Sequence, residues 1–436
     1  MSIQNSTVIR KENDATYLEI FQDIVDLMHR DYAGCNDKAD WDQPVFNQVN
    51  EIDDATFVHL VQSYLLDFKD LHIGFTDLQQ KKRDVGFTVR RFEDDLYVTS
   101  SPNDVRFQTG DKIVTLDGSG ISEIAKKYEK ELRTTIHERQ KWEPVLLDFK
   151  VAEIESKRGD KYSLELRTYE PIPYKPEYKM EELQKDILYM KVTDFMNHDA
   201  IHQLIRDHKE SLSTYPFFII DVRLNRGGSD LAYFELLPYL FEGEKIDIGE
   251  LLNETILTNC TERNVRLRIQ MLEGALTSIE DEGTRRQVYM MIKELRNHRG
   301  EGFVELNLSE LEEDLVFDTK PGPRKVIILS DVYCGSSGDS FVETCKHSSK
   351  VTVVGRPTLG MNDYANVAFE VWNNRFQLMY PTTKSSRVDE GQGMSDKGIQ
   401  PDIYVPWTPA HLQQDVDLNR AIQEIVREET EDGGGR

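Results

Sequence analysis

The sequence lacks the features that mark secreted, membrane-spanning and zinc-binding proteins. It has only four cysteines in 436 residues, scattered along the chain without a CxxC pair. This scatter predicts buried free thiols in a reducing compartment. No stretch approaches the roughly 18 consecutive apolar residues of a membrane helix, and the first residues contain no apolar core of a signal peptide. We therefore expect a cytoplasmic protein with no membrane partner.

Basic residues are scarce relative to acidic ones. Lys and Arg total 53 against 78 Asp and Glu, which gives a formal net charge of -25 at pH 7. Such a field repels nucleic acid, so we expect no nucleic-acid partner. Hydrophobic residues make up 39% of the chain and charged residues 30%, as in globular proteins. A chain of this length is expected to form about two or three domains.

The first part of the chain changes from a helical to a β pattern. Apolar residues recur at helical spacing in residues 16–30 and 55–68, which predicts a helical module over residues 1–84. From residue 85, alternating runs separated by Gly-Asp and Asp-Gly turns predict a β module. Prolines at 171, 173 and 176 mark a stiff linker, which places the end of this β module at residue 175.

The remainder alternates strands with helices, the order of a mostly parallel sheet flanked by helices. The strands are expected at residues 187–192, 217–222, 326–329 and 351–354. Two asparagines, Asn373 and Asn374, predict a type I′ hairpin. Residues 243–323 carry two helical patterns, so we expect a helical insertion that forms a lid, a dimerisation arm or surface elaboration. We assign residues 176–428 to an α/β core and 429–436 to a disordered tail.

The stretch from Lys325 to Phe341 carries the first chemical signal. Its apolar strand breaks into Gly-Ser-Ser-Gly-Asp at residues 335–339, before a helix-compatible segment. A strand, a turn of small residues and a helix hold a serine hydroxyl clear of the backbone, where helix N–H groups favour a developing negative charge. A serine here would equally serve as the helix cap, so this stretch alone leaves both interpretations open.

A second buried strand, residues 217–222, runs into the paired glycines Gly227 and Gly228. Glycine lets a backbone N–H approach a ligand closely, as a donor to an oxyanion must. A plain strand-to-helix turn would use the same residues. Asp221 and Arg223 at this strand end are expected to form a structural ion pair.

Together these stretches resemble the S41 serine peptidases, which comprise C-terminal processing proteases, the tricorn core protease and retinoid-binding relatives. The resemblance rests on a strand ending D-x-R-x-N-x-G-G from Asp221, a strand ending G-S-S-G-D from Gly335, and G-I-Q-P-D from Gly398. It implies a ClpP- or crotonase-like α/β core and a PDZ-like module at residues 85–175. Asp70-Leu71-His72, which ends the helical module, resembles the tricorn-like branch.

The resemblance implies a nucleophile and an oxyanion hole. Ser336 matches the family's nucleophile, three residues before the acidic Asp339 of the motif. The Ser337 N–H and the Gly227-Gly228 turn would donate to the oxyanion. A peptide or protein substrate would then be cleaved through an acyl-enzyme, with no metal and no organic cofactor.

The base and its orienting acid depart from the family's patterns. Processing proteases carry a lysine base where this chain has Met361. The tricorn-like branch uses a histidine after the N-terminal helices, and His72 matches that place; an imidazole titrates near ~6.5 and accepts a proton at neutral pH. That branch has a glutamate where this chain has Ser395, so Asp396 or Glu390 would orient His72, or neither would.

Three alternatives stay open. The first is a catalytically inactive peptide- or ligand-binding protein on the same fold, which the missing lysine and the displaced acid favour. The second is a crotonase-type acyl-CoA enzyme, because the family core resembles that fold. The third is zinc hydrolysis at His198 and His202, although Asp199 stands where zinc peptidases have glutamate, which favours solvated helix-entry histidines. The sequence also leaves open whether the chain forms a homo-oligomer.

Overall fold

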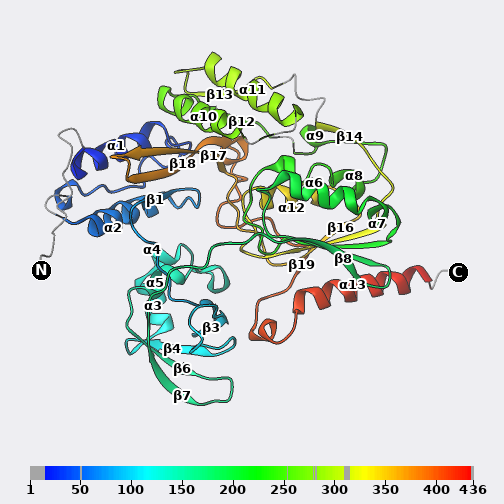
Figure 1. The fold of residues 1–436 in the computed structure, drawn as a ribbon, viewed down its shortest axis with the longest axis horizontal. Helices are drawn as coiled ribbons and strands as arrows, with labels where there is room; N and C mark the ends of the chain where they lie inside the picture. Colours follow the sequence, from blue (N-terminus) through cyan, green and yellow to red (C-terminus); the bar gives the residue numbers. More distant parts are fainter. Residues whose placement is uncertain are drawn as a thin grey trace, which may run out of the picture.

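Four β-sheets and the helices around them organise the computed structural model, which describes residues 15–49, 52–252, 254–277, 279, 282–308 and 315–433. Figure 1 places the N-terminal helices beside a late hairpin, a small β module below them, and the central sheet at the other end with the C-terminal helix. None of the described helices combines the length and apolar composition needed to cross a membrane.

The central sheet is mostly parallel, with the strand order β19-β16-β15-β10-β9-β8. Its strands are β8 (Tyr178–Gln184), β9 (Ile187–Val192), β10 (Phe217–Asp221), β15 (Lys325–Ser330), β16 (Val351–Gly355) and β19 (Ile403–Tyr404). Only β8 pairs antiparallel. Strands β10 and β15 are almost wholly buried, which is why they are continuous apolar runs rather than alternating ones. The prediction of a mixed α/β fold with a mostly parallel sheet is confirmed.

Helices cover both faces of this sheet. One face packs against α6 (His198–Asp207), α7 (Lys209–Thr214), α8 (Leu237–Leu240) and α12 (Ser337–Lys346). The other face packs against α13 (Val416–Gly433). Side chains of β10 alternate between the two cores, with Phe218 and Ile220 on the first face and Phe217 and Ile219 on the second.

An antiparallel sheet joins three distant segments of the chain. Its strands are β1 (Gly74–Asp77), β12 (Ile256–Asn259), β13 (Phe303–Glu305), β17 (Tyr364–Trp372) and β18 (Phe376–Ser385). Helices α1 (Tyr17–Arg30) and α2 (Asp54–Leu65) share a buried core with β18. The helical module therefore completes its core with the late β17–β18 hairpin. Asn373 and Asn374 at the hairpin tip both have positive φ, 54° and 51°, as the predicted type I′ turn requires.

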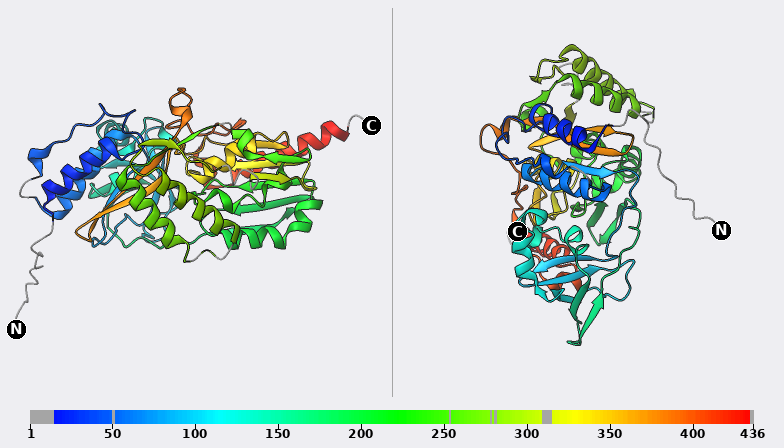
Figure 2. Two further views of the ribbon diagram at one scale, coloured as in Figure 1. Left: turned by 90° about the horizontal axis from the view of Figure 1, so that it is seen from above. Right: turned by 90° about the vertical axis from the view of Figure 1, so that its left-hand side faces the viewer.

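The two helical patterns predicted within residues 243–323 form α10 (Glu262–Ala275) and α11 (Glu282–Asn297). The flanking strands β12 and β13 add this helix pair to the antiparallel sheet. The same region also contains α9 (Ile248–Leu252) and the paired strands β11 (Lys245–Asp247) and β14 (Val316–Asp318). In the right-hand view of Figure 2, the helix pair lies above the N-terminal helices and the small β module lies below them.

The small β module has its own sheet and its own core, and we call it the β2–β7 module. Its strands are β2 (Thr88–Phe92), β3 (Asp95–Ser100), β4 (Lys112–Leu116), β5 (Ser119–Gly120), β6 (Val151–Glu155) and β7 (Lys161–Glu165). Its helices are α3 (Ile121–Lys127), α4 (Glu129–Leu132) and α5 (Glu143–Leu146). The predicted domain boundaries at residues 84, 175 and 428 stay predictions.

Short 3-10 helices connect several elements: η1 (Phe46–Gln48), η2 (Leu66–Phe68), η3 (His137–Arg139), η4 (Asp230–Ala232), η6 (Ser386–Val388) and η7 (Pro409–Leu412). Helix α13 continues to Gly433, into the segment 429–436 for which the sequence predicts disorder, and residues 434–436 lie outside the described part. The four cysteines are buried free thiols, as predicted.

Candidate active site

Ser336 lies in the turn between β15 and α12, where the sequence predicts a nucleophile. Its φ and ψ of 57° and -124° put a non-glycine residue in a strained region of backbone conformation. Its N–H donates to Asp339 Oδ2 at 2.8 Å, which fixes the turn at the start of the helix. A serine held on such a turn directs its hydroxyl away from the strand and toward the space before the helix N-terminus.

Asp339 ties this turn to the next loop of the core. Its buried carboxylate also accepts the N–H groups of Gly360 at 2.8 Å and Met361 at 3.0 Å. Burial raises the pKa of Asp339, although these hydrogen bonds and one from the Thr358 hydroxyl oppose the shift. Asp339 is therefore a structural clamp that holds the turn carrying Ser336.

The paired glycines pack directly against the serine turn. A Cβ on Gly227, whose φ is 78°, would lie 2.6 Å from Ser336 Cβ, so any side chain there would displace the serine. A Cβ on Gly228 would lie 2.2 Å from the carbonyl carbon of Phe195. The close approach of backbone to Ser336 is thus possible only with glycine.

The backbone N–H groups next to Ser336 differ in whether they donate a hydrogen bond within the protein. The Gly227 N–H donates to Asn225 Oδ1 at 2.9 Å. Within the described ranges, the N–H groups of Gly228 and Ser337 have no hydrogen-bond partner. Of the predicted oxyanion donors, these two are therefore the N–H groups left available for a ligand.

His72, the predicted base, lies between η2 and β1 and is 8% exposed. Its Nδ1 is 2.7 Å from the carbonyl oxygen of Tyr364. A carbonyl oxygen only accepts, so Nδ1 carries the proton and Nε2 keeps a lone pair. The backbone N–H of His72 donates to Asp70 Oδ1 at 2.8 Å. The imidazole is thus held in the tautomer that a general base needs.

One short segment anchors both Ser336 and His72. The Asn362 amide donates to the Ser336 carbonyl oxygen and to Ser340 Oγ, both at 2.9 Å. Two residues later, the Tyr364 carbonyl accepts from His72. Two residues of chain span at most about 7 Å, so the serine turn and the histidine loop meet at the start of β17. In the described structure no hydrogen bond joins the imidazole to the Ser336 hydroxyl. The hydrogen bond between a nucleophile and its base is often long in a free enzyme and shortens when substrate binds.

Asp396 and Glu390, the predicted orienting acids, are both exposed. Asp396 has a φ of 66° and lines a cavity, and within the part of the chain described here neither carboxylate is hydrogen-bonded to His72. Their orienting role stays a prediction. The Tyr364 carbonyl is the group that holds the ring, and sequence reasoning missed it because a backbone carbonyl leaves no mark in the sequence.

Two further charged side chains near the site were not predicted. Burial raises the pKa of Asp230 to about 6, and the nearby hydroxyls of Ser337, Tyr233 and Ser340 oppose the shift. Lys38 is 5% exposed, donates to the Phe68 carbonyl and lies 4.9 Å from the Tyr364 ring centroid. Burial lowers the pKa of Lys38, and four nearby aspartates oppose the shift. Neither residue belongs to a motif that could have singled it out.

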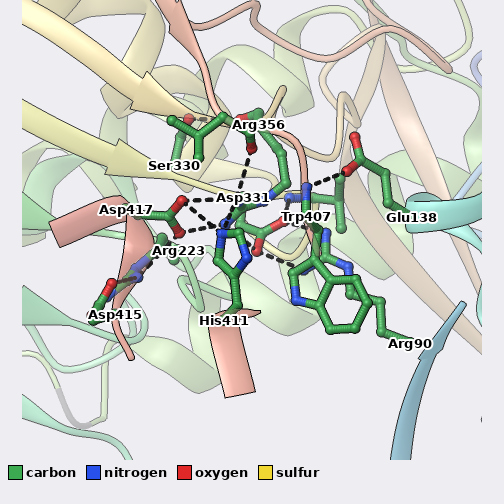
Figure 3. A network of polar contacts seen from close by, with 12 residues as sticks. Arg90, Glu138, Arg223, Ser330, Asp331, Arg356, Trp407, His411, Asp415 and Asp417 are labelled. Atoms are coloured by element: carbon green, nitrogen blue, oxygen red, sulfur yellow. Dashed lines mark hydrogen bonds and ion pairs between the residues drawn. The ribbon is translucent and has the colours of Figure 1, made fainter. Parts of the chain in front are cut away.

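A buried charge network holds the strand end that leads to Ser336, as Figure 3 shows. Arg90 of the β2–β7 module donates to both carboxylate oxygens of Asp331, at 2.8 and 2.7 Å. Arg356 also donates to Asp331 at 2.9 Å and to Asp417 of α13 at 2.9 Å. Arg223 joins Asp221, Asp415 and Asp417, so the predicted Asp221–Arg223 ion pair is confirmed as part of this network.

The network keeps its carboxylates ionised. Burial by itself would raise the pKa of Asp331, but Arg90 and Arg356 outweigh it and hold that pKa well below its ordinary value. The pKa of Asp417 is likewise held well below its ordinary value by hydrogen bonds from His411 and Arg356, against the effect of burial. This network joins the β2–β7 module, the central sheet and α13.

A cavity of about 1140 Å³ opens between the helical module and the β2–β7 module. Its walls come from α2 and β1 on one side and from α4, α5 and the loop between them on the other. Leu71 and Ile73, the neighbours of His72, line it together with Arg133 and Lys141. The cavity thus gives a peptide-sized space next to the histidine loop.

His198 and His202, considered as zinc ligands, lie at the start of α6 with ring centroids 6.3 Å apart. His202 Nε2 is 3.1 Å from the Leu231 carbonyl oxygen. Among the residues described, no group of three or more His, Cys, Asp or Glu side chains is placed to hold a metal ion.

Comparisons with known proteins agree with this geometry. The model of Peptidase family S41 matches residues 186–405, half of the chain. The crystal structure of mature CPAF is similar, with a TM-score of 0.61 at 13% identity over 91% of this chain and 94% of CPAF. Mature CPAF complexed with lactacystin gives a TM-score of 0.61 at 13% identity, over 91% and 95% of the two chains. These likenesses show a shared fold, and the family match establishes that the chain belongs to peptidase family S41.

Proposed function

We propose that this chain is a serine peptidase that cleaves peptide bonds through an acyl-enzyme, with Ser336 as nucleophile and His72 as general base. The observation that carries the proposal is the shared anchor at the start of β17, where Asn362 holds the serine turn and the Tyr364 carbonyl holds the imidazole. A strained nucleophile turn and a tautomerically defined histidine are what acyl transfer requires.

Each step follows from these groups. His72 Nε2 takes the proton of the Ser336 hydroxyl as its oxygen attacks the scissile carbonyl. The N–H groups of Gly228 and Ser337 donate to the tetrahedral oxyanion. His72 returns the proton to the leaving amine, and water activated by the same imidazole releases the acyl group. In this proposal the core is ClpP- or crotonase-like, and the PDZ-like β2–β7 module adds a peptide as a β-strand or gates the site.

A catalytically inactive peptide-binding protein on the same fold is the second candidate. The observation that favours it is the exposure of Asp396 and Glu390, neither of which is bonded to His72 in the described residues. Without an orienting carboxylate, a histidine base loses part of its power.

Labelling with a fluorophosphonate separates the two candidates. The wild-type protein should become labelled, and Ser336→Ala should not. Ser337→Ala is the matched control, because it removes a neighbouring hydroxyl and keeps the backbone N–H. His72→Gln should slow labelling by about 10² to 10⁴-fold, the usual contribution of a general base. Equal labelling of wild type and Ser336→Ala, or peptide binding without any labelling, would contradict the proposed activity.

A further inference from the structure

Lys38 is a buried cation beside the loop that carries the proposed base. It lies in the segment between α1 and α2, and Figure 1 shows both helices next to the β17–β18 hairpin. A buried ammonium group is unfavourable unless nearby carboxylates and hydrogen bonds compensate for its lost hydration. Among the described residues, no Asp or Glu forms an ion pair with Lys38. Its charge is therefore held by other contacts, and these involve the histidine loop between η2 and β1.

Lys38 contacts both elements that hold His72. Its ammonium group donates to the carbonyl oxygen of Phe68, which lies at the start of the histidine loop. The same nitrogen lies 4.9 Å from the centroid of the Tyr364 ring, and the Tyr364 carbonyl oxygen accepts the proton of His72 Nδ1. The centroid of the Trp41 ring is 5.1 Å away. Two aromatic faces and a carbonyl oxygen favour the charged ammonium form, and they tie it to the residue that fixes the imidazole.

Four aspartates lie near Lys38 and oppose the effect of burial on its pKa: Asp70, Asp363, Asp396 and Asp37. Asp37 is paired with Lys384 at 2.8 Å. The other three have no ion pair in the described ranges. Asp70 accepts only neutral donors, a tyrosine hydroxyl and a backbone N–H, and Asp363 accepts two backbone N–H groups. Lys38 is therefore a buried cation that offsets the charge of this group of carboxylates.

The charged and titratable side chains around the histidine loop come from several parts of the chain. They are Asp70 of the loop itself, Tyr32, Asp37 and Lys38 after α1, Asp363, Tyr364 and Lys384 of the β17–β18 region, Asp396, and Arg133 and Arg139 of the β2–β7 module. Carboxylates favour the imidazolium form of a nearby histidine, and cations favour the neutral form. Because Lys38 also donates to a carbonyl of the loop, the place of its charge relative to His72 is fixed.

We propose that Lys38 is a positioning residue for His72: it anchors the histidine loop, and its charge keeps the imidazole neutral and able to accept a proton at neutral pH. This inference rests on the proposed peptidase function, in which His72 Nε2 takes the proton of the Ser336 hydroxyl. Without the ammonium charge, the surrounding carboxylates would favour the imidazolium, which has no lone pair for that proton. Lys38 itself touches neither the nucleophile nor the substrate in this proposal.

The first test is the pH dependence of fluorophosphonate labelling of Ser336. Lys38→Gln removes the charge and keeps a donor for the Phe68 carbonyl. The acid limb of its pH profile should move to higher pH by about one unit, so that labelling at pH 6 slows about tenfold while the rate at pH 9 approaches that of wild type. Lys38→Met should give the same shift, and it is the second variant if the first does not fold. Lys38→Arg keeps the charge and should keep the wild-type profile.

Lys69→Gln is the matched control. Lys69 precedes Asp70 in the chain and lies 5.7 Å from the centroid of the same Trp41 ring, but it is exposed. Solvent screens its charge, so the acid limb should move by less than about 0.3 pH unit. Equal shifts for Lys38→Gln and Lys69→Gln would overturn the proposal. So would a loss of labelling that is the same at pH 6 and at pH 9, because that is the mark of a purely structural role.

The titration of His72 can also be measured without catalysis. In Ser336→Ala with isotopically labelled histidine, NMR signals of the His72 ring are assigned by their loss in His72→Gln. Adding Lys38→Gln should raise their titration midpoint by about one pH unit.

This measurement separates failure of the inference from failure of the peptidase. Labelling of wild type with an unchanged midpoint in Lys38→Gln rejects the role of Lys38 alone. A raised midpoint in a protein that is never labelled rejects the peptidase and keeps the effect of Lys38 on the imidazole.

Discussion

The β2–β7 module carries two groups of cations on the sides that face the rest of the molecule. One group is buried and paired with carboxylates, and the other faces a cavity. Arg90 is 3% exposed and pairs through two hydrogen bonds with Asp331, inside a network of arginines and aspartates. Arg133 and Lys141 face a cavity and have no ion-pair partner in the described structure. A buried, neutralised charge fixes the position of the module, and an unneutralised charge at an open wall is available to a ligand.

The largest expected effect is at Arg90. Arg90→Met should lower the free energy of unfolding by about 3–5 kcal/mol, because it leaves Asp331 buried with only Arg356. Urea unfolding measures this. Lys81→Met is the matched control: Lys81 pairs with Glu170 at 2.8 Å but both side chains are largely exposed, so the change should be below about 1 kcal/mol. Equal effects of the two variants would remove the contrast between buried and open cations.

The next largest expected effect is the fall in the free energy of unfolding when acid protonates the buried network. Because the pKa values of Asp331 and Asp417 are held low in the folded state, their ionised forms stabilise the fold above the ordinary aspartate pKa. This stabilisation is lost as the pH falls below about 4, by about 1.4 kcal/mol for each unit of pKa depression. Unfolding free energies measured from pH 6 to pH 3 should fall more steeply for wild type than for Arg90→Met. Parallel curves would contradict a network that depends on Arg90.

Asp230 provides an intermediate case: burial raises the pKa of its carboxyl, and in the described structure its Oδ1 has no hydrogen-bond partner. A folded-state pKa of about 6 means that folding favours the protonated acid, so this contribution is present below the ordinary pKa and is lost as the pH rises through about 6. Asp230→Asn should therefore raise the free energy of unfolding at pH 8 by about 1–3 kcal/mol, with no gain near pH 4. A loss of stability at both pH values would show that the carboxylate itself is required.

The smallest expected effect on stability is at the open cations. The double variant Arg133→Gln, Lys141→Gln should change the free energy of unfolding by no more than about 0.5 kcal/mol, because neither side chain has an ion pair to lose among the described residues and the repulsion between them is relieved. Urea unfolding of the double variant, measured in parallel with that of Arg90→Met, checks this. A loss of about 2 kcal/mol or more would mean that these cations hold the module in place.

Sequence patterns predicted the elements well where the information is local. Helix α1 has its apolar period and a capping box between Thr16 and Glu19. The buried strands β10 and β15 are recognisable as continuous apolar runs, and the asparagine pair marks the hairpin tip. The serine turn was found because a strand, a small-residue turn and a helix are consecutive in the chain. All of these depend on neighbours within a few residues.

Contacts between segments that are far apart in the chain could not be predicted from these local patterns. β1 pairs with β18, about three hundred residues later, and thereby brings His72 under the Tyr364 carbonyl. The core of the helical module includes Phe376 and Leu378 of that late hairpin, although the sequence presents the module as separate. Arg133 and Lys141, which precede α5 in the chain, likewise face α2 and β1 of the helical module across one cavity.

By itself, the sequence determined where helices and strands form, that a mostly parallel sheet is flanked by helices, and that a serine stands on a turn of small residues between a strand and a helix. Dihedral preferences and the alternation of apolar residues act over a few positions, so they can be read along the chain. The tertiary structure alone decided which carbonyl holds the imidazole, which N–H groups stay unpaired and which cations lack a partner. These depend on how separate surfaces dock, where burial and shape complementarity act between residues that no local pattern relates.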